Sequence, residues 1–216
     1  MKRVFGLYEA VFDVVYLALT LVIGVWLIAT AESGSLRLLA GIMALILGGG
    51  DAFHLLPRIM VIHTQKEEAF RTSLGRGKQI TSITMTVFYL LLWNIGVRYY
   101  FLENTGMWTC LIYSLAIIRI LLCLAPQNCW LDRYPPQMFA ILRNIPFFLI
   151  GIMTVCLYFA NRGQELGLVW MWLAVLLSFL FYFPVVLWAN RYPAVGMLML
   201  PKTCAYMWML VMCLKL

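Results

Sequence analysis

Apolar residues run in long stretches along this chain, and short polar stretches interrupt them. A helix needs about 20 mostly apolar residues to cross the hydrocarbon layer of a bilayer. Seven stretches approach or exceed that length, and no stretch between them is long enough to form a soluble domain. The pattern therefore predicts an all-α polytopic integral membrane bundle that forms one domain over residues 1–216. The predicted spans are residues 8–30, 36–62, 80–101, 107–125, 138–160, 167–189 and 195–214.

Composition supports a membrane protein. Hydrophobic residues make up 64% of the chain and charged residues 12%, whereas a soluble globular chain is about 45–50% apolar and about 25% charged. The acidic residues Glu9 and Asp13 argue against a cleaved signal peptide, because signal peptides begin with a basic segment. The first apolar stretch is therefore predicted to be a retained helix. The six cysteines include no CxxC pair, which favours free thiols over a disulfide framework or a zinc site.

Basic residues flank the predicted spans unequally, and cytoplasmic loops carry the excess of lysine and arginine. The sequence therefore predicts a cytoplasmic N-terminus, an external C-terminus and a location in the cell (inner) membrane, with membrane lipids as partners. The net charge of +7 is then explained by basic loops beside anionic lipids, and no nucleic-acid site is expected. The predicted inner side carries Lys2, Arg3, Lys66, Arg71, Arg76, Lys78, Arg133 and Arg191, and the outer side carries Arg37, Arg98, Arg162 and Lys215.

Ionisable residues also occur within the spans or at their edges. A charge at the centre of the apolar layer costs at least about 2.5–3.5 kcal/mol, so such residues face the bundle interior, a partner or water. With the predicted orientation they all fall in the inner half of the membrane, which predicts a polar, basic-leaning cavity open to the cytoplasm. The residues are Glu9, Asp13, Asp51, His54, Arg58, Arg119, Arg143 and Lys202.

Asp51, His54 and Arg58 are spaced i, i+3 and i+7, so they share one face of a helix. One hypothesis makes Asp51 and His54 a catalytic acid/base pair, in which Asp51 holds one tautomer of His54 and Arg58 binds an anion. The alternative is an Asp51–Arg58 ion pair, with Arg58 extending to the lipid head groups.

The other candidates are predicted to bind a ligand. Glu9 and Asp13 are like charges one turn apart, so they either need cations opposite them, with Arg119, Arg143 and Lys202 as candidates, or are solvated at the interfacial start of the helix. Only His54 and His63 are present as histidines, and no thiolate pair accompanies them, so a zinc site is not expected. A Mg²⁺ or Ca²⁺ ion bridging Glu9, Asp13 and Asp51 is chemically possible but has no motif, so no metal or cofactor is predicted. The predicted ligand-binding residues are Asp13, Arg58, Arg119, Arg143, Asn144 and Lys202.

Two short stretches resemble known membrane families. Residues 47–57, with Gly50 and Asp51, resemble the Gly-Asp helix of lysoplasmalogenase-like membrane hydrolases, which implies a lipid hydrolase. That family's second acidic motif has no counterpart here, and its usual eight helices exceed the predicted seven. Residues 182–186, with Lys202, are similar to microbial rhodopsins, but the proline–lysine spacing differs and the third span lacks a counter-ion motif. Neither resemblance assigns the chain to a family.

Three functions are consistent with the sequence. The first is binding or movement of an anionic or amphiphilic small molecule by the buried cations. The second is a membrane enzyme that acts on a lipid-like substrate through Asp51 and His54, with Arg119 or Arg143 stabilising negative charge. The third is a structural or assembly factor whose charges pair internally. The outer half has few polar groups, which disfavours a transporter that opens to both sides.

Overall fold

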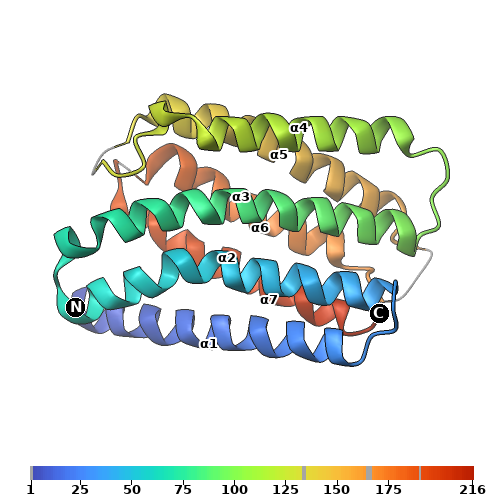
Figure 1. Ribbon diagram of the computed structural model, residues 1–216, viewed down its shortest axis with the longest axis horizontal. Coiled ribbons are helices and arrows are strands. Elements are labelled where there is room, and N and C mark those ends of the chain that lie inside the picture. Colours follow the sequence, from blue (N-terminus) through green and yellow to red (C-terminus); the bar gives the residue numbers. More distant parts are fainter. Residues whose placement is uncertain (1, 133–134, 164–166, 190) are drawn as a thin grey trace.

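Seven long helices lie alongside one another in the computed structural model, which describes residues 2–132, 135–163, 167–189 and 191–216 (Figure 1). Each has the length and apolar composition needed to cross a membrane, so the chain is an all-α multi-pass membrane protein. The helices are α1 (Lys2–Ala29), α2 (Leu36–Thr64), α3 (Glu67–Tyr99), α4 (Gly106–Leu124), α5 (Gln137–Ala160), α6 (Met171–Trp188) and α7 (Met199–Cys213), with the short 3-10 helices η1 (Pro126–Asn128) and η2 (Pro193–Leu198).

The seven predicted spans are confirmed, but several of their boundaries differ, most of all at the start of α3. Helix α3 begins at Glu67 instead of residue 80, because the polar segment before the apolar stretch continues the helix. Glu67 and Glu68 lie in its first turn, where carboxylates interact favourably with the helix dipole. The seventh predicted span begins as the 3-10 helix η2 and becomes α-helical only at Met199.

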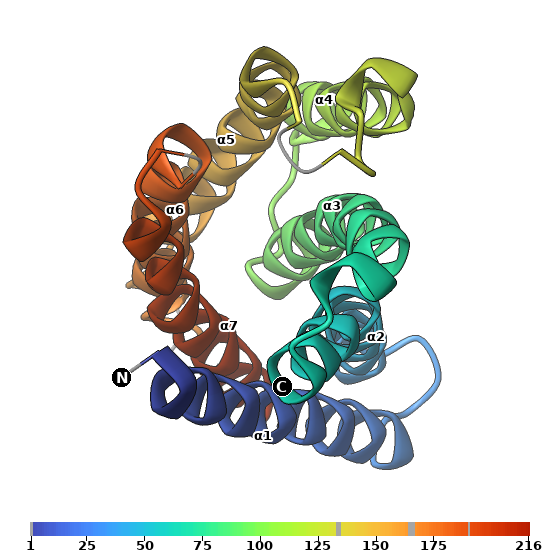
Figure 2. The same cartoon turned by 90° about the vertical axis from the view of Figure 1, so that its left-hand side faces the viewer.

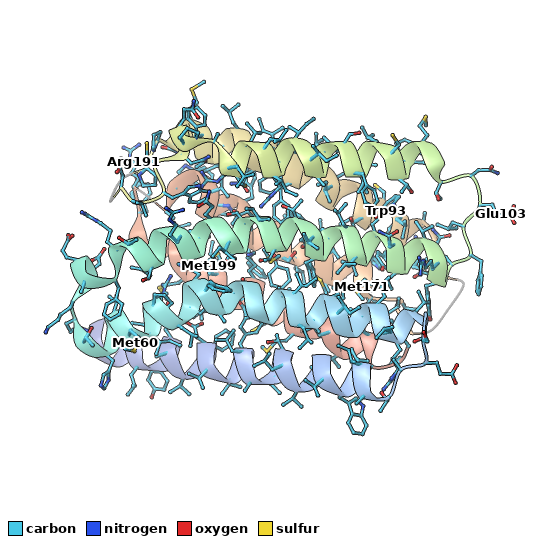
Figure 3. The ribbon with its side chains drawn as sticks, in the orientation of Figure 1. Met60, Trp93, Glu103, Met171, Arg191 and Met199 are labelled. Carbon is cyan, nitrogen blue, oxygen red and sulfur yellow. The ribbon has the colours of Figure 1, made fainter. Side chains whose placement is uncertain are left out.

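Consecutive helices are neighbours, and α7 closes the bundle by packing against α1 and α2 (Figure 2). The N-terminus and the α2–α3, α4–α5 and α6–α7 connections lie at one end, which we call the N-terminal end (Figure 1). Figure 3 places Met60 and Arg191 toward this end and Glu103 at the opposite one. The side of the membrane that it faces stays a prediction, and Arg133, one of the basic residues behind that prediction, lies outside the described residues.

Glycines bring α2 close to both of its partners. A Cβ at Gly48 would lie 2.4 Å from Thr20 Oγ1 on α1, and a Cβ at Gly50 would lie 1.9 Å from Thr84 Oγ1 on α3. A Cβ at Gly77 on α3 would lie 2.2 Å from the carbonyl oxygen of Phe53. The three helices are therefore closely packed, and at Gly77 the backbone of α3 lies directly against that of α2, as small residues allow in membrane bundles. This packing fixes where the polar residues of α2 lie.

Candidate functional site

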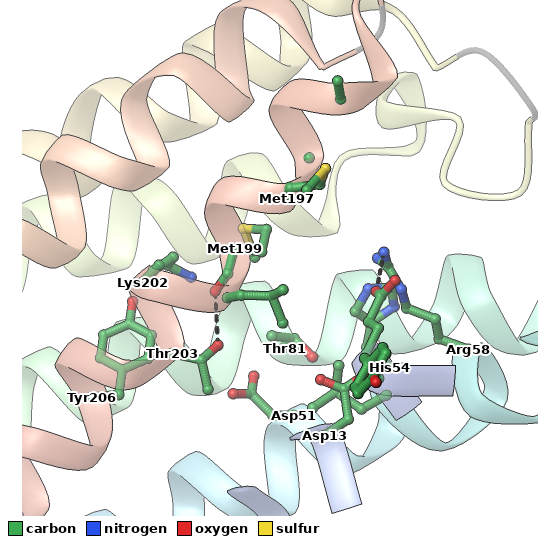
Figure 4. Close-up of a pocket in the computed structure, with 16 residues that line it drawn as sticks. Asp13, Asp51, His54, Arg58, Thr81, Met197, Met199, Lys202, Thr203 and Tyr206 are labelled. Atoms are coloured by element: carbon green, nitrogen blue, oxygen red, sulfur yellow. Dashed lines mark hydrogen bonds and ion pairs between the residues drawn. The ribbon is translucent and has the colours of Figure 1, made fainter. Parts of the chain in front are cut away.

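A cavity of about 860 Å³ lies among α1, α2, α3, η2 and α7, and Figure 4 shows its lining. This volume is within the range of about 300–1,000 Å³ that small-molecule sites occupy. Five of the predicted site residues line it, from three helices: Asp13, Asp51, His54, Arg58 and Lys202. Its other lining residues are Tyr8, Glu9, Leu55, Thr81, Ala194, Gly196, Met197, Met199, Leu200, Thr203 and Tyr206.

Asp51 is held in place by contacts on both sides of α2. Its Oδ2 accepts a hydrogen bond of 2.6 Å from the hydroxyl of Tyr16 on α1. The carbonyl of the preceding Gly50 accepts a hydrogen bond of 2.8 Å from Thr81 Oγ1 on α3. Both contacts depend on the close approach of the helices, so the glycine-rich segment also positions this carboxylate.

His54 lines the cavity one turn further along α2, but its predicted pairing with Asp51 is not present. No hydrogen bond joins the two side chains. Asp51 Oδ2 instead accepts a hydrogen bond from the hydroxyl of Tyr16. His54 Nδ1 is buried and has no hydrogen-bond partner within the described ranges. The i, i+3 spacing puts both residues on one face, but the donor to the Asp51 carboxylate is the hydroxyl of Tyr16 and not His54. In this arrangement Asp51 does not fix the tautomer of His54.

Glu9 and Arg58 form an ion pair across the α1–α2 interface. This contact settles the alternatives for Arg58, whose partner is Glu9 and not Asp51. It also supplies the cation that the Glu9–Asp13 pair was predicted to need, as a close ion pair with Glu9 and as a longer-range attraction to Asp13. Asp13 is 5% exposed, and its Oδ2 has no hydrogen-bond partner in the part of the chain that the structure describes.

Lys202 enters the cavity from α7. It is 7% exposed, and its Nζ lies 4.7 Å and 4.8 Å from the ring centres of Tyr182 and Tyr206. Aromatic faces attract ammonium groups at this separation. Among the described residues, the ion pairs within 4.0 Å are Arg58–Glu9 and Arg71–Glu68, so Lys202 has no carboxylate at that distance.

The cavity lining is less basic than the sequence predicts. It contains the carboxylates Glu9, Asp13 and Asp51 but only two cations, Arg58 and Lys202. With His54 neutral, the formal sum is minus three plus two, or minus one. The expected cluster of four cations is divided, because Arg119 and Arg143 do not line this cavity.

Arg119 lies in the packed interior and is 2% exposed. Its guanidinium lies over the ring of Phe147, 3.4 Å from the ring centre, and its Nη2 donates a long hydrogen bond of 3.5 Å to the carbonyl of Ser82. Nε and Nη1 are buried without a hydrogen-bond partner in the described segments. Arg119 thus has an aromatic partner in place of the expected carboxylate.

Arg143 and Asn144 are held by separate contacts near the α4–α5 connection. Arg143 Nη1 donates a hydrogen bond of 2.7 Å to Asn128 Oδ1, and its guanidinium lies 4.2 Å from the ring centre of Trp130. Asn144 accepts a hydrogen bond of 3.1 Å from the hydroxyl of Tyr182, whose ring faces Lys202. Tyr182 therefore links this second group of polar residues to the cavity.

Sequence reasoning missed Tyr16 and Tyr206. Tyr16 falls three residues after Asp13, on the same face of α1, so helical spacing could have identified it as a partner for a carboxylate on α2. Tyr206 falls four residues after Lys202 on α7 and lines the same cavity. Nothing in the sequence indicated that η2 lines the cavity, because its residues resemble the start of an ordinary apolar span.

No metal site is evident, since the described residues contain no group of three or more histidine, cysteine, aspartate or glutamate side chains able to hold an ion. The chain matches no model of a protein family, and searches of curated proteins and of solved structures also give no match. The function is therefore argued from the cavity itself.

Proposed function

We propose that this membrane protein binds an amphiphilic small molecule in the cavity among α1, α2, α3, η2 and α7. The observation that carries the proposal is that the lining combines two kinds of side chain, apolar and ionisable. Leu55, Met197, Met199 and Leu200 provide apolar and flexible surface. The ionisable side chains come mainly from α1, α2 and the start of α7. A molecule with an apolar chain and a charged head group satisfies both kinds.

Binding has more support than catalysis. The enzyme hypothesis rested on a hydrogen bond between Asp51 and His54, and Asp51 instead accepts one from Tyr16. The third hypothesis, a structural factor with internally paired charges, predicts an ion partner for each buried charge. Among the described ion pairs, Arg58 has such a partner, whereas Asp13, Arg119 and Lys202 do not.

Filling the cavity tests the proposal. Leu55 lines the cavity, whereas its neighbour Leu56 is 53% exposed and does not. We expect Leu55→Trp to weaken binding of 12-(dansylamino)dodecylphosphocholine, a fluorescent single-chain amphiphile, at least tenfold because the indole occupies the chain's space. Leu56→Trp is the matched control and should bind like the wild type. Fluorescence titration of both variants in nonionic detergent measures this, and equal binding by the two would contradict the proposal.

We also propose that the cavity opens toward the cytoplasm, because the basic residues of the connecting segments predict that the N-terminal end faces inward. Alkaline phosphatase, which is active only outside the cytoplasm, should be inactive when fused after Asp132 and active when fused after Lys215. Both fusions keep the preceding spans intact. Activity after Asp132 combined with inactivity after Lys215 would reverse the proposed orientation.

A further inference from the structure

Internal pairing leaves three charges in the cavity. Glu9 and Arg58 neutralise each other in their ion pair. The remaining charged lining residues are Asp13, Asp51 and Lys202, two carboxylates and one ammonium group. None of the three has an oppositely charged side chain within 4.0 Å in the described ranges. Asp51 and Lys202 attract each other over a longer distance, so the charges that lack a close ion partner are of both signs.

Asp13 is the carboxylate in greatest need of a cation. Asp51 already accepts a hydrogen bond from Tyr16, whereas Asp13 Oδ2 has no donor in the described structure and the residue is 95% buried. A buried carboxylate without a partner is costly in an apolar surrounding. A cationic group on the ligand would offset this cost, and an organic ammonium group is the cation that an amphiphilic ligand can carry.

Lys202 provides the opposite charge on another wall of the cavity. In Figure 4 it extends from α7, whereas Asp13 lies beside His54 and Arg58, with Asp51 between the two in this view. The rings of Tyr182 and Tyr206 flank its ammonium group but supply no negative charge. A phosphate or carboxylate group is the fitting partner for Lys202.

We propose that the ligand's head group is zwitterionic, with a cationic ammonium group at Asp13 and an anionic group at Lys202. This inference rests on the proposed amphiphile-binding function and specifies its ligand class. A purely anionic head group would face Asp13 and Asp51 as like charges. A purely cationic head group would leave Lys202 unpaired and add a second positive charge beside it. A zwitterion matches both walls at once.

Three probes with matched dodecyl chains test the inference: dodecylphosphocholine, tridecanoate (a carboxylate on a dodecyl chain) and dodecyltrimethylammonium. The stabilisation of the purified protein against heat is measured as each is added, below its micelle concentration, to protein in dodecyl maltoside. We expect dodecylphosphocholine to bind at least tenfold more tightly than either singly charged probe. Phosphocholine without a chain should bind at least tenfold more weakly than dodecylphosphocholine, which separates a lipid-like ligand from a water-soluble one.

Two variants assign the charges. Asp13→Asn should remove the advantage of dodecylphosphocholine over tridecanoate, and Lys202→Gln should remove its advantage over dodecyltrimethylammonium. Glu32→Gln and Lys215→Gln, at exposed positions near the opposite end, are the matched controls and should keep both advantages. The comparison of the three probes on the wild type stands even if a variant fails to fold.

The outcomes separate the two proposals. Saturable binding of all three probes with equal affinity overturns the zwitterion inference and leaves the amphiphile site in place. Equal binding by phosphocholine with and without its chain overturns the amphiphile site. Absence of saturable binding by every probe also overturns it, and the inference falls with it.

Discussion

Replacing Gly77 with alanine should lower the free energy of unfolding by about 3 kcal/mol, at the upper end of what overpacking a well-packed interior costs. The added methyl group would lie 2.2 Å from the carbonyl oxygen of Phe53 and 2.8 Å from the Cα of His54. Both are backbone atoms of α2, so no side-chain rotation can relieve the overlap and α3 must move away. Thermal unfolding in detergent measures the loss.

Gly49→Ala is the matched control. Gly49 is a glycine within α2, between Gly48 and Gly50, but nothing lies within 4 Å of a Cβ placed there. Because alanine has a higher helix propensity than glycine by about 1 kcal/mol, this variant should be as stable as the wild type or more stable. If Gly77→Ala unfolds at the same temperature as Gly49→Ala, the backbone contact between α2 and α3 is not as close as described.

Arg119→Met should have the opposite effect and raise the free energy of unfolding. The substitution removes two buried nitrogens that lack a hydrogen-bond partner in the described structure, and each such group costs about 1–3 kcal/mol. It also removes the contact with Phe147, which is worth at most about 2 kcal/mol. The balance favours methionine by about 1–3 kcal/mol, because its flexible chain fills similar space. Thermal unfolding in detergent again measures the difference.

Arg37→Met tests whether this gain is specific to Arg119. Arg37 donates hydrogen bonds of 2.7 Å to Thr30 Oγ1 and 3.1 Å to the carbonyl of Leu214. Its removal should lower the stability slightly or leave it unchanged, since these exposed hydrogen bonds are lost without relief of any unpaired group. A loss of stability in Arg119→Met would mean that the arginine has a partner that the described contacts do not include.

The membrane fold was predictable because it depends on local apolar length, which the sequence displays directly. Each of the seven spans is long enough to be identified alone. The start of α3 was not predictable in this way, because residues 67–79 are mostly polar and their helical structure has no hydropathy signal. The 3-10 geometry of η2 was also hidden, since hydropathy does not distinguish it from the first turns of α7.

The candidate site was only partly predictable for a related reason. Helical spacing placed Asp51, His54 and Arg58 on one face, and all three line the cavity. Partners across helices depend on how the helices are rotated against each other, which one sequence does not specify. Tyr16 therefore replaced His54 as the partner of Asp51, and Glu9 replaced Asp51 as the partner of Arg58. Arg119 and Arg143 lie beside a different set of helices and do not line the cavity.

The close α2–α3 contact divides the cavity wall into a stiff part and an adjustable part. Only Gln65 and Lys66 join these two helices, and Gly50 and Gly77 hold them at backbone distance. They must therefore move as one block if the protein changes shape. A change in the width of the cavity has to come from α1, or from α7 with the 3-10 turn that precedes it. Asp13 lies on α1 and Lys202 on α7. A ligand that contacts both residues would therefore pull α1 and α7 toward each other, against the rigid α2–α3 pair.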